Sequence, residues 1–123
     1  MKKMSETELE IMKVLWDSHP QKATQIIQQI KLSKTWSDKT IRTLIDRCVG
    51  KEVVGIDKSQ KEYQFYPLMT RSECEKEMQL ELSNKLYDGS IKNMIASYFM
   101  EGNLSKEDIK EIKQMIEELE KDG

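Results

Sequence analysis

The apolar residues near the start of the chain recur at helical spacing. Ser5 and Glu8 form a capping-box pattern, in which the two side chains satisfy free backbone N–H groups at a helix start. One apolar side follows, formed by Leu9, Ile11, Met12, Leu15 and Trp16. Because Pro20 lacks a backbone N–H, this helix is expected to end at residues 18–20. The pattern predicts an amphipathic helix with one face in a core.

Two further helices are predicted before residue 50. The shorter one covers residues 24–31, where three isoleucines share a face. After a loop at residues 32–36, Ser37 is a candidate N-cap and Asp38 adds negative charge to the first turn of a longer helix. This helix is expected to end near Gly50 and has an apolar side of Ile41, Leu44, Ile45 and Cys48. Its other surfaces carry basic or hydroxylated residues, which are Lys39, Thr40, Arg42, Thr43 and Arg47.

A β-hairpin is predicted after the third helix. Residues 53–56 and 63–66 are rich in β-branched and aromatic side chains, which favour strands. The polar segment 57–62 joins them, and Lys58 and Lys61 are expected to be exposed at its tip. Four aromatic side chains of this half are expected to pack in the core, namely Trp16, Trp36, Tyr63 and Phe65.

Beyond Pro67 the pattern is helical throughout. A weak apolar stripe at Cys74, Met78, Leu82 and Leu86 is broken at residues 88–90, and a second break falls at residues 102–103. Between the breaks lies a dense amphipathic segment with Ile91, Met94, Ile95, Tyr98 and Phe99 on one face. The last helix carries an a/d seam formed by Ile109, Ile112, Ile116 and Leu119. Both faces are typical of helices that pack on other helices, so they are candidate dimerisation residues.

Composition limits the class of protein. A chain of 123 residues fits one small domain with a helical appendage. Its 37% hydrophobic and 34% charged residues are too apolar for a disordered tail and too polar for a membrane protein. With no apolar run of about 18 residues and no apolar signal segment, the protein is expected to be cytoplasmic.

The sequence offers little support for catalysis or for a cofactor. Cys48 and Cys74 lie on predicted helices and are expected to be buried packing residues rather than a disulfide. His19 is the one histidine and there is no Cys-x-x-Cys pair, so no metal is expected. Neither a nucleophile elbow nor a glycine-rich phosphate loop is present, so no enzymatic activity is expected.

Charge is divided unevenly between the two halves. Residues 1–69 hold 12 Lys and Arg against 9 Asp and Glu, whereas residues 70–123 hold 8 against 13. The formal net charge of -2 therefore hides a basic N-terminal half. This imbalance is too small to indicate nucleic-acid binding without support from the arrangement of the elements.

Three helices followed by a hairpin describe a winged helix-turn-helix. The predicted fold is mainly α with a small β-hairpin wing: residues 1–69 form a winged-helix DNA-binding domain, and residues 70–123 form a helical dimerisation domain. In the major groove, Arg42 and Thr43 are the best candidates for reading bases. The candidates for phosphate contact are Ser37, Lys39, Lys58 and Lys61. Thr40 and Arg47 are further candidate DNA-binding residues. One recognition helix reads only a few base pairs, so a homodimer on two half-sites is expected.

Two other interpretations remain for these residues. Lys and Arg on a helix surface usually form only a solvated face. The acidic C-terminal half also fits a winged-helix protein-interaction module without specific DNA binding. Such a module would show no salt-dependent affinity for DNA, because no counterions would be released.

A family resemblance adds to this reading. The sequence reads ELEIMKVLW at residues 8–16 and WSDKTIRTLIDR at residues 36–47. Both stretches resemble the BlaI/MecI penicillinase-repressor family, and the likeness continues at residues 63–66, 84–89 and 104–109. It implies a homodimeric repressor that binds a palindromic operator of the TACA/TGTA type and controls β-lactamase or penicillin-binding-protein genes. It also implies a membrane β-lactam-sensor protease as a partner, and hence a role in β-lactam resistance.

The chain departs from the family pattern at two places. The family is typically cleaved at an Asn-Phe bond in the helix before the last, where this chain has Ser97-Tyr98 as the candidate cleavage site. Relatives carry an uncharged residue and a lysine at the positions of Asp46 and Gly50. Less positive charge there is expected to weaken phosphate contact.

Overall fold

In a computed structural model, which describes residues 3–122, the chain divides into two compact units, Met1–Lys76 and Glu77–Gly123. We call them the N-terminal and the C-terminal unit. The described residues form helices and a small sheet, which confirms the predicted fold class. The outer ends of the predicted domains, residues 1 and 123, lie outside the described residues.

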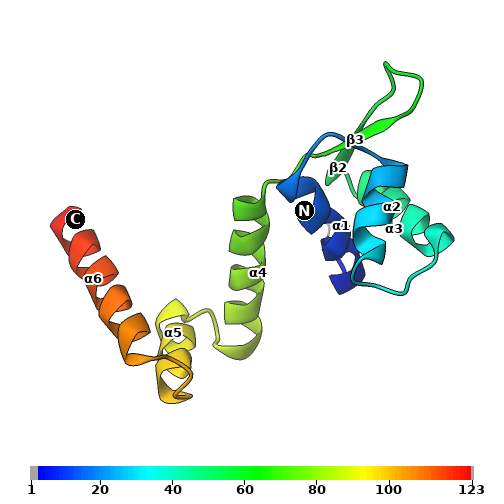
Figure 1. Ribbon diagram of the computed structural model, residues 1–123. Helices are drawn as coiled ribbons and strands as arrows, with labels where there is room; N and C mark the ends of the chain where they lie inside the picture. The colour runs from blue at the N-terminus through cyan, green and yellow to red at the C-terminus, as the bar shows by residue number, and fades with distance from the viewer. Residues whose placement is uncertain (1–2, 123) are drawn as a thin grey trace. The chain divides into compact units, whose positions relative to one another are not determined.

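Three helices build the core of the N-terminal unit. They are α1 (Glu6–Asp17), α2 (Ala23–Lys31) and α3 (Asp38–Gly50), and they cluster beside the sheet in Figure 1. The predicted capping box is present, because Ser5 Oγ accepts a hydrogen bond from Glu8 N and Glu8 Oε1 accepts one from Ser5 N. The apolar sides predicted from spacing meet in one buried cluster, to which Ile11, Leu15, Ile26, Ile30, Ile41, Leu44, Ile45 and Cys48 contribute.

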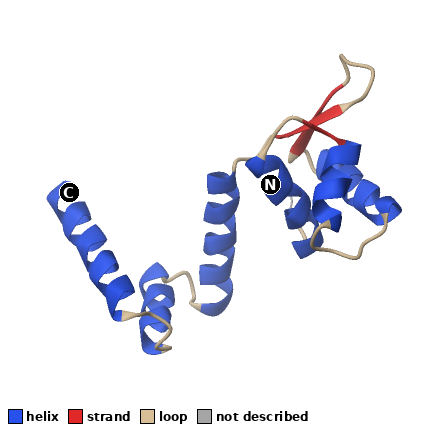
Figure 2. Ribbon diagram, viewed as in Figure 1, coloured by secondary structure: helices blue, strands red, loops and turns tan. Residues whose placement is uncertain are grey.

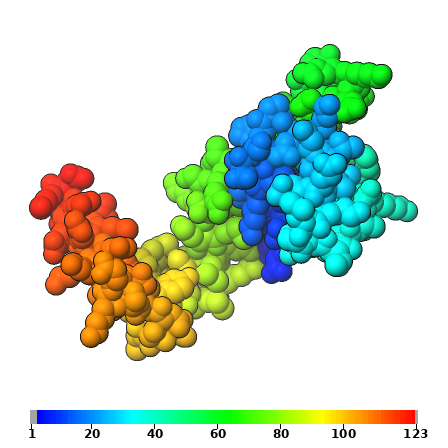
Figure 3. All heavy atoms as spheres, in the orientation of Figure 1, coloured from blue at the N-terminus to red at the C-terminus, as the bar shows by residue number. Residues whose placement is uncertain are grey.

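A three-stranded antiparallel sheet completes this unit. Its strands are β1 (Gln21–Lys22), β2 (Val54–Asp57) and β3 (Gln64–Pro67), in the order β1-β3-β2. The hairpin was predicted and its strands lie one residue later than expected, whereas β1 was not predicted. Figure 2 shows the two hairpin strands continuing into a loop, and Figure 3 shows that loop projecting from the rest of the N-terminal unit. This projection is the wing.

Helix α3 ends at Gly50, as the sequence predicted. The left-handed conformation after it falls on Glu52, with a φ of 62°. The chain therefore turns towards β2 two residues after Gly50. One prediction for this unit is wrong, since Tyr63 was expected in the core and is 50% exposed. The cysteines follow the prediction, since Cys48 and Cys74 are both buried.

An ion pair with a buried carboxylate joins the first turn of α1 to Lys51, the residue after α3. The Glu8 side chain is 2% exposed, and its Oε1 lies 2.6 Å from Lys51 Nζ. Burial opposes ionisation of this carboxyl, but hydrogen bonds from Lys51 and Ser5 outweigh it and hold the pKa of Glu8 below its usual value of 4.5. The charge on Glu8 therefore stabilises the fold as long as Lys51 is present.

Replacing Lys51 with methionine should lower the free energy of unfolding by about 1–3 kcal/mol at neutral pH, because the buried carboxylate loses its partner. A depressed folded-state pKa stabilises the fold above the unfolded pKa, and this stabilisation disappears as the pH falls through the folded value. The difference between wild type and K51M should therefore shrink below pH 4.5, the ordinary value for Glu8. Urea denaturation of both proteins at neutral pH and below pH 4.5 measures this difference in the free energy of unfolding.

The matched control for this prediction is Lys13→Met. Lys13 also faces a glutamate, Glu10 at 3.6 Å, but half of its side chain is exposed to solvent. Exposed pairs contribute about 0–1 kcal/mol, so K13M should change stability little. Equal losses of stability in K51M and K13M would contradict the buried-pair account.

Three helices follow the sheet. They are α4 (Arg71–Leu86), α5 (Ile91–Met100) and α6 (Lys106–Asp122). The predicted breaks are confirmed by positive φ angles at Gly89 (82°) and Gly102 (72°), a conformation that glycine adopts without strain. Helix α4 begins in the N-terminal unit, where Cys74 is buried, and continues into the C-terminal unit. None of the described helices is long and apolar enough to cross a membrane.

Candidate nucleic-acid interface

The third helix presents a continuous polar face. The N-cap Ser37 accepts a hydrogen bond from Thr40 N at 3.1 Å, which fixes the first turn. The apolar side of α3 is buried in the core, so its other side remains in solvent. All of the candidate DNA-binding residues on and before α3 are exposed, namely Ser37, Lys39, Thr40, Arg42, Thr43 and Arg47.

The hydroxyl groups on this face are partly used within the helix. Ser37 Oγ donates to Thr40 Oγ1 at 3.0 Å, and Thr43 Oγ1 donates to the carbonyl of Lys39 at 3.0 Å. The Thr43 hydroxyl therefore has its oxygen lone pairs and its methyl group free for an outside contact. A methyl group of this kind can pack on the methyl group of thymine in the major groove.

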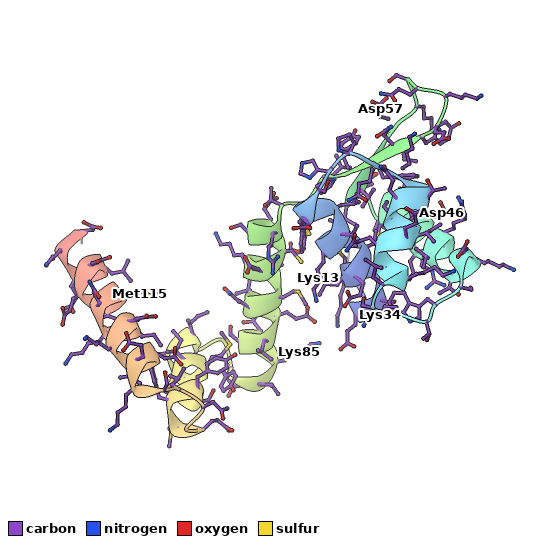
Figure 4. All side chains as sticks on the ribbon, viewed as in Figure 1. Lys13, Lys34, Asp46, Asp57, Lys85 and Met115 are labelled. Atoms are coloured by element: carbon purple, nitrogen blue, oxygen red, sulfur yellow. The ribbon has the colours of Figure 1, made fainter. Side chains whose placement is uncertain are left out.

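Two acidic residues of α3 differ in their surroundings. Asp38 Oδ1 accepts a hydrogen bond from Lys31 Nζ at 2.6 Å, and this bond, with the nearby positive charge of Lys31 and Arg42, lowers the pKa of Asp38. Asp46, labelled in Figure 4, is exposed. It lies four residues after Arg42, about one helical turn along α3. The charge of Asp38 is therefore paired with that of Lys31 on α2, whereas Asp46 adds negative charge to the polar face of α3.

A concave surface lies between the start of α2, the middle of α3 and the wing. Arg42 and Lys61, both predicted from the sequence, line it together. The sequence prediction missed four further polar residues that line it, which are Lys22, Thr24, Glu62 and Tyr63. Lys22 and Thr24 come at the start of α2, where backbone N–H groups lack helical partners. The hollow is lined by three cations, Lys22, Arg42 and Lys61, and by one carboxylate, Glu62, which pairs with Lys22. The excess of positive charge favours an anion there.

Local contacts order the side chains of the wing. Lys58 Nζ lies 5.4 Å from the centre of the Tyr63 ring, a cation–π distance. Lys22 Nζ lies 3.2 Å from Glu62 Oε2, which links β1 to the wing. Asp57, near the base of the loop in Figure 4, accepts a hydrogen bond from Ser59 N at 2.9 Å, and the hydrogen bonds from Ser59 lower the pKa of Asp57. Lys58 and Lys61 are exposed, as predicted.

The candidate dimerisation residues lie on α5 and α6. Met94 is the one that is buried, at 7% exposure, and Ile112 is half-buried. The others are exposed large apolar side chains, namely Ile91, Ile95, Tyr98, Phe99, Ile109, Ile116 and Leu119. So many exposed apolar groups on two helices are typical of an interaction surface.

The candidate cleavage site lies inside α5. Ser97 Oγ donates to the carbonyl of Met94 at 2.6 Å and lies 3.0 Å from the hydroxyl of Tyr87. Tyr98 is exposed. The Ser97-Tyr98 peptide bond therefore lies within a helix, and the Ser97 side chain is hydrogen-bonded to Tyr87, the residue after α4. Within residues 3–122, no group of three His, Cys, Asp or Glu side chains is placed to hold a metal ion.

Comparison with known proteins identifies relatives of the whole chain. A family model described as "Penicillinase repressor" matches residues 4–118. The methicillin resistance regulatory protein MecI of Staphylococcus aureus strain N315 is 31% identical over 113 residues, which cover 92% of each chain. The penicillinase repressor of Bacillus licheniformis is 30% identical over 115 residues, which cover 94% of this chain and 90% of the relative.

Two solved structures resemble the N-terminal part. The solution structure of the DNA-binding domain of the repressor BlaI superposes with a TM-score of 0.52 and 32% identity, over 59% of this chain and 93% of that one. Monomeric BlaI of Bacillus licheniformis in complex with the blaP half-operator superposes with a TM-score of 0.52 and 29% identity, over 58% of this chain and 88% of that one.

Proposed function

Because the chain belongs to the penicillinase repressor family, we propose that it is a DNA-binding transcriptional repressor whose recognition helix is α3. The observation that carries this proposal is the exposed face of α3, capped by Ser37 and bordered by the concave surface that Arg42 shares with the wing. BlaI, a solved relative, was studied in complex with a half-operator. The expected place of action is the cytoplasm.

The residues divide into two roles on DNA. Arg42 and Thr43 read base edges, since they lie in the middle of the polar face of α3. Ser37, Lys39 and Thr40, at the first turn, contact phosphate where free backbone N–H groups and the helix dipole attract anions. Arg47, Lys58 and Lys61 are also proposed to hold phosphate. Lys22 and Thr24 are proposed to join them, because they line the concave surface together with Lys61. The phosphate contacts set position and affinity, and the base contacts set sequence preference.

The proposed active form is a homodimer on a palindromic operator of the TACA/TGTA type. A second copy of the chain is proposed to cover the exposed apolar residues of α5 and α6. When two recognition helices are linked, binding of the first one raises the effective concentration of the second one at its half-site. A single helix on one half-site does not gain this added affinity. The regulated genes proposed from the family are those for β-lactamase or penicillin-binding proteins.

Comparing a full palindromic duplex with a half-site duplex tests the dimer. The full duplex should bind tighter by about a hundredfold or more, the range that linkage of two sites commonly provides. Sedimentation of the complexes should give two chains per full duplex and one per half-site. Equal affinity for the two duplexes would contradict the dimeric repressor.

Repression is proposed to end when a membrane β-lactam-sensor protease triggers cleavage at Ser97-Tyr98. A cut at this bond in α5 separates the winged helix from α6 and its seam. A chain that stops at Ser97 should therefore keep its half-site affinity but lose the added affinity for the full palindrome. An equal preference for the full palindrome in the shortened and intact chains would contradict this release mechanism.

Removing the negative charge of Asp46 should strengthen DNA binding. The variant D46N should gain about 0.2–1 kcal/mol at low salt, because an exposed carboxylate on the polar face repels phosphate. Fluorescence anisotropy on the same duplex measures the gain. The control is D17N, which removes an equal charge from the exposed end of α1. Equal gains in both variants would show a general charge effect and contradict the placement of Asp46 near DNA.

A further inference from the structure

The first turn of α4 belongs to the core of the winged helix. A capping box starts it, since Glu73 N donates to Thr70 Oγ1 at 3.1 Å and Thr70 N donates to Glu73 Oε1 at 3.2 Å. Two apolar anchors flank this cap, Met69 at 4% exposure and Cys74 at 2%. Because both are part of the core cluster, the start of α4 is packed on the N-terminal unit rather than joined to it by a free linker.

Trp16 on α1 makes a polar contact with the junction between β3 and α4, residues 68–71. Its indole Nε1 donates to the carbonyl of Met69 at 2.8 Å, one residue before the N-cap of α4. The guanidinium of Arg71, in the first turn of α4, lies 5.9 Å from the centre of the Trp16 ring. Leu68 N also donates to the carbonyl of Val53 at 2.9 Å, so the chain leaving β3 is held on two sides.

We propose that Trp16 is a positioning residue that fixes the start of α4 on the winged helix and thereby restricts which operator half-site spacings the dimer accepts. The inference rests on the proposed function. Helix α4 runs from Arg71 to Leu86 without interruption, and a continuous helix is a stiff connection. A helix anchored at its first turn limits the separations at which two recognition helices reach DNA, whereas a loose junction would tolerate many spacings equally.

A set of palindromic duplexes that differ only in half-site spacing tests this inference. Wild type should prefer one spacing, and Trp16→Phe, which keeps an aromatic ring but loses the N–H donor, should discriminate among spacings about fivefold less. Its affinity for a half-site duplex should stay at the wild-type value, because the hydrogen bond that the variant removes is made to Met69, outside α3 and the wing loop. A general loss of structure would lower half-site affinity as well, so the two readouts separate positioning from folding.

Two further variants make the test specific. Trp36→Phe is the matched control, since Trp36 also packs partly on the core and carries a lysine over its ring, Lys34 at 5.6 Å, but lies before α3. It should leave spacing discrimination unchanged, whatever it does to overall affinity. Arg71→Gln, at an exposed position, should reduce discrimination in the same direction as W16F.

Three outcomes would overturn the inference. Unchanged spacing discrimination in both W16F and R71Q would show that the junction does not restrict spacing. An equal change in W16F and W36F would show that the effect is not specific to α4. Equal affinity of the wild-type protein for the palindromic and the half-site duplexes would overturn the proposed dimeric function, and this inference with it.

Discussion

Replacing Arg42 with alanine should weaken operator binding by about 1–3 kcal/mol and relax sequence preference at the base pair that Arg42 reads. Arg42 is exposed in the middle of α3 and lines the concave surface next to the wing, so it can reach the floor of a groove. A guanidinium can donate two parallel hydrogen bonds to one guanine, which an alanine methyl cannot replace. Fluorescence anisotropy with single-base variants of the operator measures both effects.

Two further variants separate base reading from charge. Arg42→Lys keeps the charge but loses the planar fork, so it should recover general affinity without recovering sequence preference. Lys13→Ala removes a positive charge from α1 (Figure 4), away from the proposed interface, and should bind nearly as wild type. Unchanged operator affinity in R42A would mean that α3 does not lie in the groove as proposed.

Placing a charge in the α6 seam should abolish the dimer. In Ile116→Glu, a carboxylate would be buried between two copies of α6, where desolvation of an unpaired charge costs several kcal/mol. The Ile116 side chain is 49% exposed in the single chain, so the protomer should still fold. Sedimentation should find monomers, and operator affinity should fall to that of a half-site. This is the largest loss expected from any single substitution in the C-terminal unit.

The control for this variant is Gln114→Glu. It adds the same charge to α6 at an exposed position outside the predicted seam and should remain dimeric. A dimeric I116E, with full operator affinity, would show that the seam of α6 is not the interface. Monomers in both variants would show that the charge of α6, rather than its apolar face, controls association.

The features that sequence predicted well are local ones. The capping box of α1 joins residues three positions apart, and the apolar side of α3 follows from helical spacing alone. The breaks at Gly89 and Gly102 were readable because glycine adopts positive φ without strain. Such signals are carried by neighbouring residues, so they survive without knowledge of the tertiary structure.

The features that sequence missed depend on contacts between distant segments. Strand β1 has two residues and exists because Gln21 and Lys22 pair with Phe65 and Gln64 of β3. No periodicity marks so short a strand. The Glu8–Lys51 pair likewise joins residues 43 positions apart. Predicting either contact requires knowing how α1, α3 and the sheet pack, which spacing does not specify.

The candidate interface shows the same division. The polar face of α3 was predicted from its spacing, but the contribution of Lys22 and Thr24 at the start of α2 was not, because only the fold brings them beside Arg42. Tyr63 was expected in the core because aromatic residues in strands are usually buried. It is instead exposed, one residue before β3, with Lys58 over its ring. Its position at the edge of the loop allows this.

The most direct test of the central claim is the affinity of the intact protein for a palindromic TACA/TGTA duplex and for a scrambled duplex over a series of salt concentrations. The account predicts tight, cooperative binding to the palindrome that weakens steeply as salt rises, because phosphate contacts release counterions. It predicts much weaker binding to the scrambled duplex. No binding to either duplex at low salt would contradict the account and favour a winged-helix module that binds protein instead of DNA.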